Sequence, residues 1–133
     1  MDLLGDWWSP LILRDACMGH RRFEQFQKSL GIGRSVLALR LRRFVDEGLF
    51  EKRAYQQNPV RYEYTLTEKG ADLFGVLTAM MRWGDRWLDT GSGPPVVLRH
   101  RTCDSVTHAA VVCALCGEPL RPQDMRLERS GGT

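Results

Sequence analysis

The chain has 133 residues, of which 43% are hydrophobic and 26% charged, values usual for a globular protein that exclude extensive disorder. It contains no run of eighteen apolar residues and does not begin with the pattern of a secretory signal, so we expect a cytoplasmic protein without a membrane span. The net charge of +3 is unevenly distributed, since residues 20–61 hold 10 basic and 4 acidic side chains. This local excess is typical of a surface that binds phosphates.

The first predicted helix begins near Ser9. Serine is a good N-cap residue, and Pro10 can occupy the first helical position without losing a hydrogen bond. The helix continues to Gly19 and contains Cys17, which is most simply a small core residue. A second interpretation, that Cys17 senses oxidants, requires an exposed thiol with a lowered pKa.

Two more helices with a glycine-containing turn between them follow. Phe23, Phe26 and Leu30 recur at helical spacing, and residues 31–33 then break the helix. The next helix covers residues 34–47 and is closed by Gly48. Its apolar stripe consists of Leu37, Leu41, Phe44, Val45 and, beyond its end, Leu49. A supporting helix followed by an amphipathic helix with an arginine-rich outer side predicts a helix-turn-helix.

After Gly48 the hydrophobic period changes from 3.6 to 2, which predicts a β-hairpin with strands at 50–55 and 61–66. The side chains expected to face the helices are Tyr62, Tyr64 and Leu66. The cations expected on the solvent side or near the tip, within reach of phosphates or a minor groove, are Lys52, Arg53 and Arg61. A hairpin in this position is the wing of a winged helix-turn-helix.

The outer side of the helix at 34–47 is the predicted reading surface for double-stranded DNA. Arginine can bind guanine through two hydrogen bonds, and alanine or leucine can contact a thymine methyl group. The residues predicted to contact DNA from this helix are Arg34, Ser35, Ala38, Leu39, Arg42 and Arg43. Lys52, Arg53 and Arg61 of the hairpin complete the predicted interface.

Four motifs occur in order along this part of the chain. They are Asp6-Trp7-Trp8-Ser9-Pro10-Leu11-Ile12-Leu13-Arg14-Asp15, Arg22-Phe23-Glu24-Gln25-Phe26, Val36-Leu37-Ala38-Leu39-Arg40-Leu41 and Arg61-Tyr62-Glu63-Tyr64-Thr65-Leu66-Thr67-Glu68-Lys69-Gly70. Over roughly residues 4–88 the chain resembles the HxlR-type transcriptional regulators, relatives of the MarR group. The resemblance implies a homodimeric winged helix-turn-helix regulator that binds operator DNA and often responds to electrophiles or oxidants. Two departures are the short segment before the first motif, where many relatives carry a sensing cysteine, and Leu39 at a position that is frequently polar.

A long helix is predicted from Thr67, a suitable N-cap, to about residue 89. Its apolar residues cover more than one stripe, so one face can cover the winged domain while the other needs a partner. The simplest partner is the same helix of a second subunit related by a two-fold axis. The predicted dimer-interface residues are Leu77, Met80, Met81, Trp83 and Trp87. The last four could instead line a pocket for a small-molecule effector, although packing is the simpler role.

Residues 91–95 have the composition of a linker, and residues 96–133 are predicted to form a separate small module with a disordered end. Pairing of residues 96–99 with 109–112 would bring together two ligand pairs. The predicted zinc ligands are His100, Cys103, Cys113 and Cys116, with His108 as an alternative fourth ligand. A mobile tail without metal and a thiol switch at Cys113 and Cys116 remain open alternatives.

The predicted fold is therefore mainly helical with a small β-wing: a winged helix-turn-helix over residues 1–90, dimerising through terminal helices, followed by a short cysteine-rich module. The predicted function is a sequence-specific transcriptional regulator, a repressor, that acts as a homodimer on a pseudo-palindromic operator. The alternatives are a winged helix used for protein contacts and a thiol- or metal-based redox protein. An enzyme is not expected, because no general base accompanies the cysteines and no glycine-rich phosphate loop is present.

Overall fold

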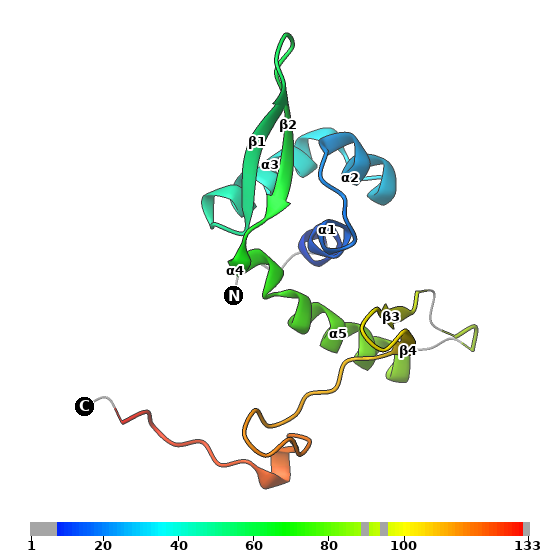
Figure 1. Ribbon diagram of the computed structural model, residues 1–133, viewed down its shortest axis with the longest axis vertical. Helices are drawn as coiled ribbons and strands as arrows, with labels where there is room; N and C mark the ends of the chain where they lie inside the picture. The colour runs from blue at the N-terminus through cyan, green and yellow to red at the C-terminus, as the bar shows by residue number, and fades with distance from the viewer. Residues whose placement is uncertain (1–7, 89–90, 94–95, 132–133) are drawn as a thin grey trace. The chain divides into compact units, whose positions relative to one another are not determined.

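The structure of the protein is a computed structural model that describes residues 8–88, 91–93 and 96–131. It divides into two compact units, a first unit that ends at Leu77 and a second unit that begins at Thr78. The first unit contains three helices, a two-stranded hairpin and a short fourth helix (Figure 1).

The three helices of the first unit are α1 (Trp8–Cys17), α2 (Phe23–Leu30) and α3 (Arg34–Asp46). These bounds confirm the predicted helix-turn-helix. Gly31 ends α2 with a φ of 64°, a left-handed conformation that strains residues with a Cβ atom. Ser9, the predicted N-cap, lies inside α1, because the described part of this helix already begins at Trp8.

A single hydrophobic core holds these helices against the hairpin. Leu37, Leu41 and Phe44 of α3 are completely buried, as the predicted apolar stripe requires. The ring of Phe44 packs edge-on against Phe50 with centroids 5.4 Å apart, which fixes α3 against the start of the hairpin. The other core residues are Ile12, Leu13, Phe26, Ile32, Leu49 and Leu77. Burial of one such side chain contributes about 1.5–3 kcal/mol, so this core determines which side of α3 faces outward.

The wing consists of β1 (Phe50–Gln56) and β2 (Arg61–Leu66), which pair in antiparallel register with Phe50 opposite Leu66. Its tip projects beyond the helices (Figure 1). Residues 21–22 lie beside β2 as well, since the Tyr64 amide donates to the Arg21 carbonyl at 2.6 Å. The hairpin is therefore anchored on one side by the segment that leads into α2.

The register refines the predicted sides of the wing. Tyr64 and Leu66 are half-buried against the core as predicted, whereas Tyr62 is 43% exposed because it lies nearer the tip. Lys52 is exposed, but it lies opposite Tyr64 and therefore belongs to the helix-facing side of the sheet. Side chains alternate between the two faces of a strand, so Lys52 shares the face of the buried Phe50. The prediction that Lys52 lies on the solvent side was therefore wrong about the face of the sheet.

The predicted single helix from residue 67 to 89 is wrong. The structure has two helices in this region, α4 (Glu68–Ala71) and α5 (Phe74–Trp87). Thr67 is the N-cap of α4 as predicted, because its hydroxyl oxygen accepts a hydrogen bond from the Gly70 amide at 3.1 Å. The break occurs where the Leu73 amide donates to the carbonyl of Gly70, three residues back, so the turn is tighter than an α-helix.

Gly70 is the point at which α4 touches the preceding strand. A Cβ atom at this position would collide with the Leu49 carbonyl oxygen and would lie 2.9 Å from Cδ2 of Leu66. We expect Gly70→Ala to lower the free energy of unfolding by about 1–3 kcal/mol, because the backbone would have to move. Chemical denaturation measures this change. Gly75→Ala is the matched control, since a Cβ atom at this position of α5 would enter open space. This substitution should leave the free energy of unfolding equal or raise it by up to about 1 kcal/mol. Equal effects of the two substitutions would contradict the expectation.

The second unit contains most of α5, the hairpin β3 (Leu98–His100) with β4 (Ser105–Thr107), and a 3-10 turn, η2 (Pro122–Asp124). The predicted pairing of residues 96–99 with 109–112 is wrong. Leu98 instead pairs with Thr107 across a short turn, and Val112 bridges Pro119 further on. Two local hairpins close shorter loops than one long-range pairing, which costs less chain entropy. Within the described ranges, no helix is long and apolar enough to cross a membrane.

Candidate nucleic-acid interface

The outer side of α3 is a continuous exposed surface. Because the apolar stripe of α3 faces the core, the remaining positions of the helix point outward. The predicted contact residues that are exposed there are Arg34, Ser35, Ala38, Leu39 and Arg42. These five residues are named the outer face of α3. Arg43, the sixth predicted residue, is half-buried at the edge of this face.

The N-terminal end of α3 is the part of this face closest to α2. The Arg34 guanidinium lies 5.1 Å from the centroid of the Phe23 ring, a contact that orients the side chain between the two helices. Gly33 is the N-cap and contributes no side-chain capping bond to α3. Amide groups at such a helix start, together with the helix dipole, favour a phosphate.

The cations of the wing are exposed and only weakly paired. Arg61 lies 3.8 Å from a carboxylate oxygen of Glu24, and Arg53 lies 3.8 Å from Glu51. Exposed ion pairs of this kind contribute at most about 1 kcal/mol, so phosphates can replace the carboxylates at little cost. The Lys52 ammonium lies 4.3 Å from the centroid of the Tyr62 ring. The wing therefore presents three cations whose present partners are exchangeable.

A groove of about 480 Å³ separates the wing from the starts of α2 and α3. Its lining includes Arg34, Arg61 and Tyr62, so predicted contact residues from the helix and from the wing meet in one concavity. Arg22 is a basic residue near this region that the sequence prediction missed. Its guanidinium lies 3.9 Å from the centroid of the Tyr55 ring, and its backbone bridges to Glu63. The adjacent basic residues Arg21 and Arg22 could have indicated this position in the sequence. Only the pairing of Arg22 with β2 shows that its side chain lies beside the wing.

The predicted dimer-interface residues of α5 divide into two groups. Met80, Trp83 and Trp87 are 51%, 59% and 62% exposed, while Met81 is half-buried. Leu77 is instead 7% exposed and belongs to the core of the first unit, so the structure does not place it on an available surface. Helical spacing puts Leu77 on the face that the winged domain covers.

The second unit contains a cavity of about 260 Å³. Met81 lines it together with Val97, Leu98 and Val106, so the lining is mostly apolar. The predicted pocket residues Met80, Trp83 and Trp87 do not line it. Only one of the four predicted side chains therefore contributes to this cavity.

Cys17 has the properties of a packed residue. It is half-buried against the core of the first unit, and burial raises the pKa of its thiol. A raised pKa reduces the fraction of reactive thiolate at neutral pH, which is the reverse of what an oxidant sensor needs. The structural surroundings thus favour the packing interpretation of Cys17.

The predicted zinc ligands form two separate pairs. Sγ of Cys103 lies 3.7 Å from Nδ1 of His100, and Cys113 shares a tight turn with Cys116. Hydrogen bonds to Cys113 lower the pKa of its thiol, first from the Cys116 amide and then from the Leu115 amide. In the part of the chain that the structure describes, no group of three or more potential ligands is close enough to hold a metal ion. The predicted four-ligand set is therefore not assembled in the structure.

Three helices, a basic outer face on the third helix and a paired wing with exposed cations define the class of winged helix-turn-helix proteins. The comparisons with known proteins name the family. The HxlR-like helix-turn-helix family model matches residues 3–92, and the chain belongs to this family. Its relatives are transcriptional regulators, the class of protein that the sequence predicted in place of an enzyme.

Three relatives indicate how far the similarity extends. The HTH-type transcriptional regulator Rv3095 of Mycobacterium tuberculosis is 42% identical over 132 residues, which cover 99% of this chain and 84% of that protein. The solved structure of PA1607, assigned as a transcription factor, is 37% identical with a TM-score of 0.85 and covers 96% of this chain and 89% of that chain. The redox regulator HypR in its reduced form is 30% identical with a TM-score of 0.62, covering 66% of this chain and 88% of that chain.

The relatives differ in how much of the second unit they match. The family match ends at residue 92, and the HypR similarity covers about the same share of the chain. Rv3095 and PA1607 match nearly the whole chain. The segment after α5 is therefore shared with some relatives and lies outside the part that defines the family.

Proposed function

We propose that the protein is a homodimeric transcriptional repressor that binds a pseudo-palindromic operator through the outer face of α3. The observation that carries this proposal is the two-sided character of α3. Leu37, Leu41 and Phe44 are fully buried on one side, so the helix cannot rotate, and Arg34 and Arg42 remain exposed on the other. A helix held in this way can enter a major groove, where arginine side chains recognise guanine.

The wing supplies the second set of contacts in the proposal. Arg61 lines the same groove as Arg34, and the exposed Lys52 lies over the ring of Tyr62, which lines this groove too, so both cations can follow the DNA backbone or the adjacent minor groove. Their contribution would be mainly electrostatic and independent of sequence. The proposed interface therefore separates base recognition by α3 from backbone contacts by the wing.

The proposed dimer forms through the exposed apolar side of α5. Met80, Trp83 and Trp87 together present an apolar surface that water covers in a single subunit. A second copy of the helix would cover it, as expected for an isologous two-fold interface. Two copies of α3 would then lie about 34 Å apart, one turn of B-DNA, and would read two half-sites.

The proposed repressor works in the cytoplasm, where its operator is located, and a small molecule or an oxidant releases it. Such a signal would change the relative tilt of the two α3 helices so that both can no longer bind. HypR is a redox regulator, which supports a test with oxidants. Because burial raises the Cys17 pKa, we propose that Cys17 is not the sensor, and Cys17→Ser should then leave any oxidant response unchanged.

The proposal is tested by the salt dependence of binding to a duplex selected from a random library. Fluorescence anisotropy should show an affinity that falls steeply with salt, and Arg61→Ala should reduce the slope of log K against log salt by about 0.9 per lost phosphate contact. Arg126→Ala, an exposed arginine of the second unit paired with Glu128, is the control and should leave the slope unchanged. Salt-independent binding, or no selected sequence, would favour the alternative of a winged helix for protein contacts.

A further inference from the structure

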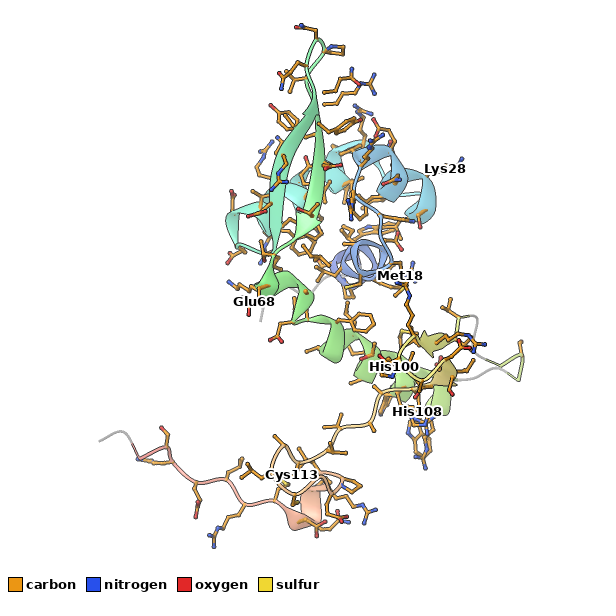
Figure 2. All side chains as sticks on the ribbon, viewed as in Figure 1. Met18, Lys28, Glu68, His100, His108 and Cys113 are labelled. Atoms are coloured by element: carbon orange, nitrogen blue, oxygen red, sulfur yellow. The ribbon has the colours of Figure 1, made fainter. Side chains whose placement is uncertain are left out.

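Two successive turns in the second unit each hold one pair of potential metal ligands, and Figure 2 labels one member of each pair, His100 and Cys113. In the first hairpin, His100 ends β3 and Cys103 lies in the turn before β4, with Nδ1 and Sγ 3.7 Å apart. In the second hairpin, Cys113 and Cys116 occupy the turn between Val112 and Pro119. Each local turn therefore brings two ligands to one end of a hairpin before any long-range contact forms.

The turn at Cys113 has backbone groups directed at its sulfur. The Leu115 amide donates to Sγ of Cys113 at 3.4 Å, and the Gly117 amide donates to the Cys113 carbonyl at 2.9 Å. The Cys113 amide in turn donates to the Glu118 carbonyl at 2.8 Å, which closes the hairpin. Gly117 has a φ of 80°, a conformation that favours glycine and lets the chain reverse directly after Cys116. Amide donors of this kind stabilise a thiolate, which is the form that binds a metal.

This part of the chain has almost no hydrophobic core. Between residues 99 and 131, Ala109 and Cys113 are half-buried and all other residues are exposed. Leu115 and Leu127 are 98% and 99% exposed. A two-stranded hairpin is at best marginally stable alone in water, so two such hairpins need a further source of stability. A bound metal can provide it, since the free energy of metal binding becomes folding free energy in small modules.

The connection between the hairpins permits the two ligand pairs to meet. Residues 108–111 have no helix or strand, and nine residues separate Cys103 from Cys113. Of these nine residues, Ser105–Thr107 form β4 and Val112 bridges Pro119, so closure of the site requires a bend within residues 108–111, which span about 13 Å when extended. The two pairs are separate in the structure, and closure would be coupled to metal binding.

We propose that His100, Cys103, Cys113 and Cys116 bind one zinc ion per chain and that this ion joins the two hairpins into one module. Three thiolates and one imidazole form a tetrahedral set that prefers zinc, and four protein ligands leave no open position for catalysis. The three cysteine thiols release their protons as the metal binds. The role of the ion is structural, and the proposal is independent of DNA binding.

The test is a metal analysis of the full-length protein, purified without chelators, by inductively coupled plasma mass spectrometry. We expect one zinc per chain, and substitution of Cys113 and Cys116 together by serine should reduce it to less than a tenth. Cys17→Ser is the matched control and should keep the full amount, because Cys17 lies in the other unit. His100→Ala should lower the zinc content whereas His108→Ala should not.

A second measurement separates metal binding from loss of folding. Removal of zinc with a chelator should make residues 96–131 at least ten times more sensitive to limited proteolysis, while the first unit should remain protected by its core. Three results would overturn the proposal: protein free of metal with all thiols reduced, a Cys113–Cys116 disulfide in protein purified under reducing conditions, or half a zinc per chain, which would indicate a site shared by two chains. Full zinc content in the double serine variant would overturn it as well.

Discussion

Simultaneous substitution of Arg34 and Arg42 by alanine is expected to weaken operator binding by roughly 30-fold or more. Each arginine that recognises a base contributes about 1–3 kcal/mol of discrimination, so loss of both removes about 2 kcal/mol or more. The proposed homodimer would lose both side chains twice, which increases the effect. Anisotropy titrations with the selected duplex and with a scrambled duplex measure the loss and show whether it is specific to sequence.

Folding should be unaffected by this double substitution, because both arginines are exposed and neither belongs to the core. Thermal unfolding of the variant should therefore resemble that of the parent protein. Leu41→Ala is the contrasting variant, since Leu41 is completely buried on the opposite side of α3 and its truncation should cost about 2–5 kcal/mol of stability. An arginine double variant that binds the operator as tightly as the parent would exclude the outer face of α3 as the reading surface.

Introduction of two glutamates into α5, Met80→Glu with Trp83→Glu, is expected to convert the proposed dimer into monomers. Two carboxylates from each subunit would have to be buried without partners, which costs several kcal/mol at a two-fold interface. Sedimentation velocity measures the change in mass. The monomer should also lose affinity for the full operator by at least about 100-fold, because two half-sites would no longer be bound together.

Val60→Glu is the matched control for this second experiment. Val60 is also an exposed apolar residue, 49% exposed, but it belongs to the tip of the wing in the first unit. The control should remain a dimer, so the effect of a new charge on solubility or shape is separated from the effect on the interface. A Met80→Glu, Trp83→Glu variant that sediments as a dimer would show that another surface joins the subunits.

Local patterns in the sequence predicted the elements of the first unit well. The spacing of Phe23, Phe26 and Leu30 marks α2, and Gly31 and Gly48 mark two helix ends, because backbone conformation at these residues depends on near neighbours. Long-range pairing was predicted less well. Arg22 joins β2 from a distant part of the chain, and no periodic pattern around Arg22 encodes that contact.

The second unit was predicted less accurately for a related reason. Its Cys and His motifs predict two pairs of metal ligands, which stays a prediction, and the strand pairing was assigned between the wrong segments. With so few buried side chains, alternation gives little information about which segments pair. Short hairpins closed by local turns then form in preference to a longer connection.

By itself, the sequence determined the class of fold, the family, and the separation of α3 into an apolar and a basic side, since each follows from residue spacing along a single element. Only the tertiary structure decided that Leu77 belongs to the core, that α4 and α5 are two helices, and that Lys52 lies on the helix-facing side of the wing. These features depend on which elements pack against each other. Burial and strand register are set by contacts between residues far apart in the chain, and these contacts leave no local pattern in the sequence.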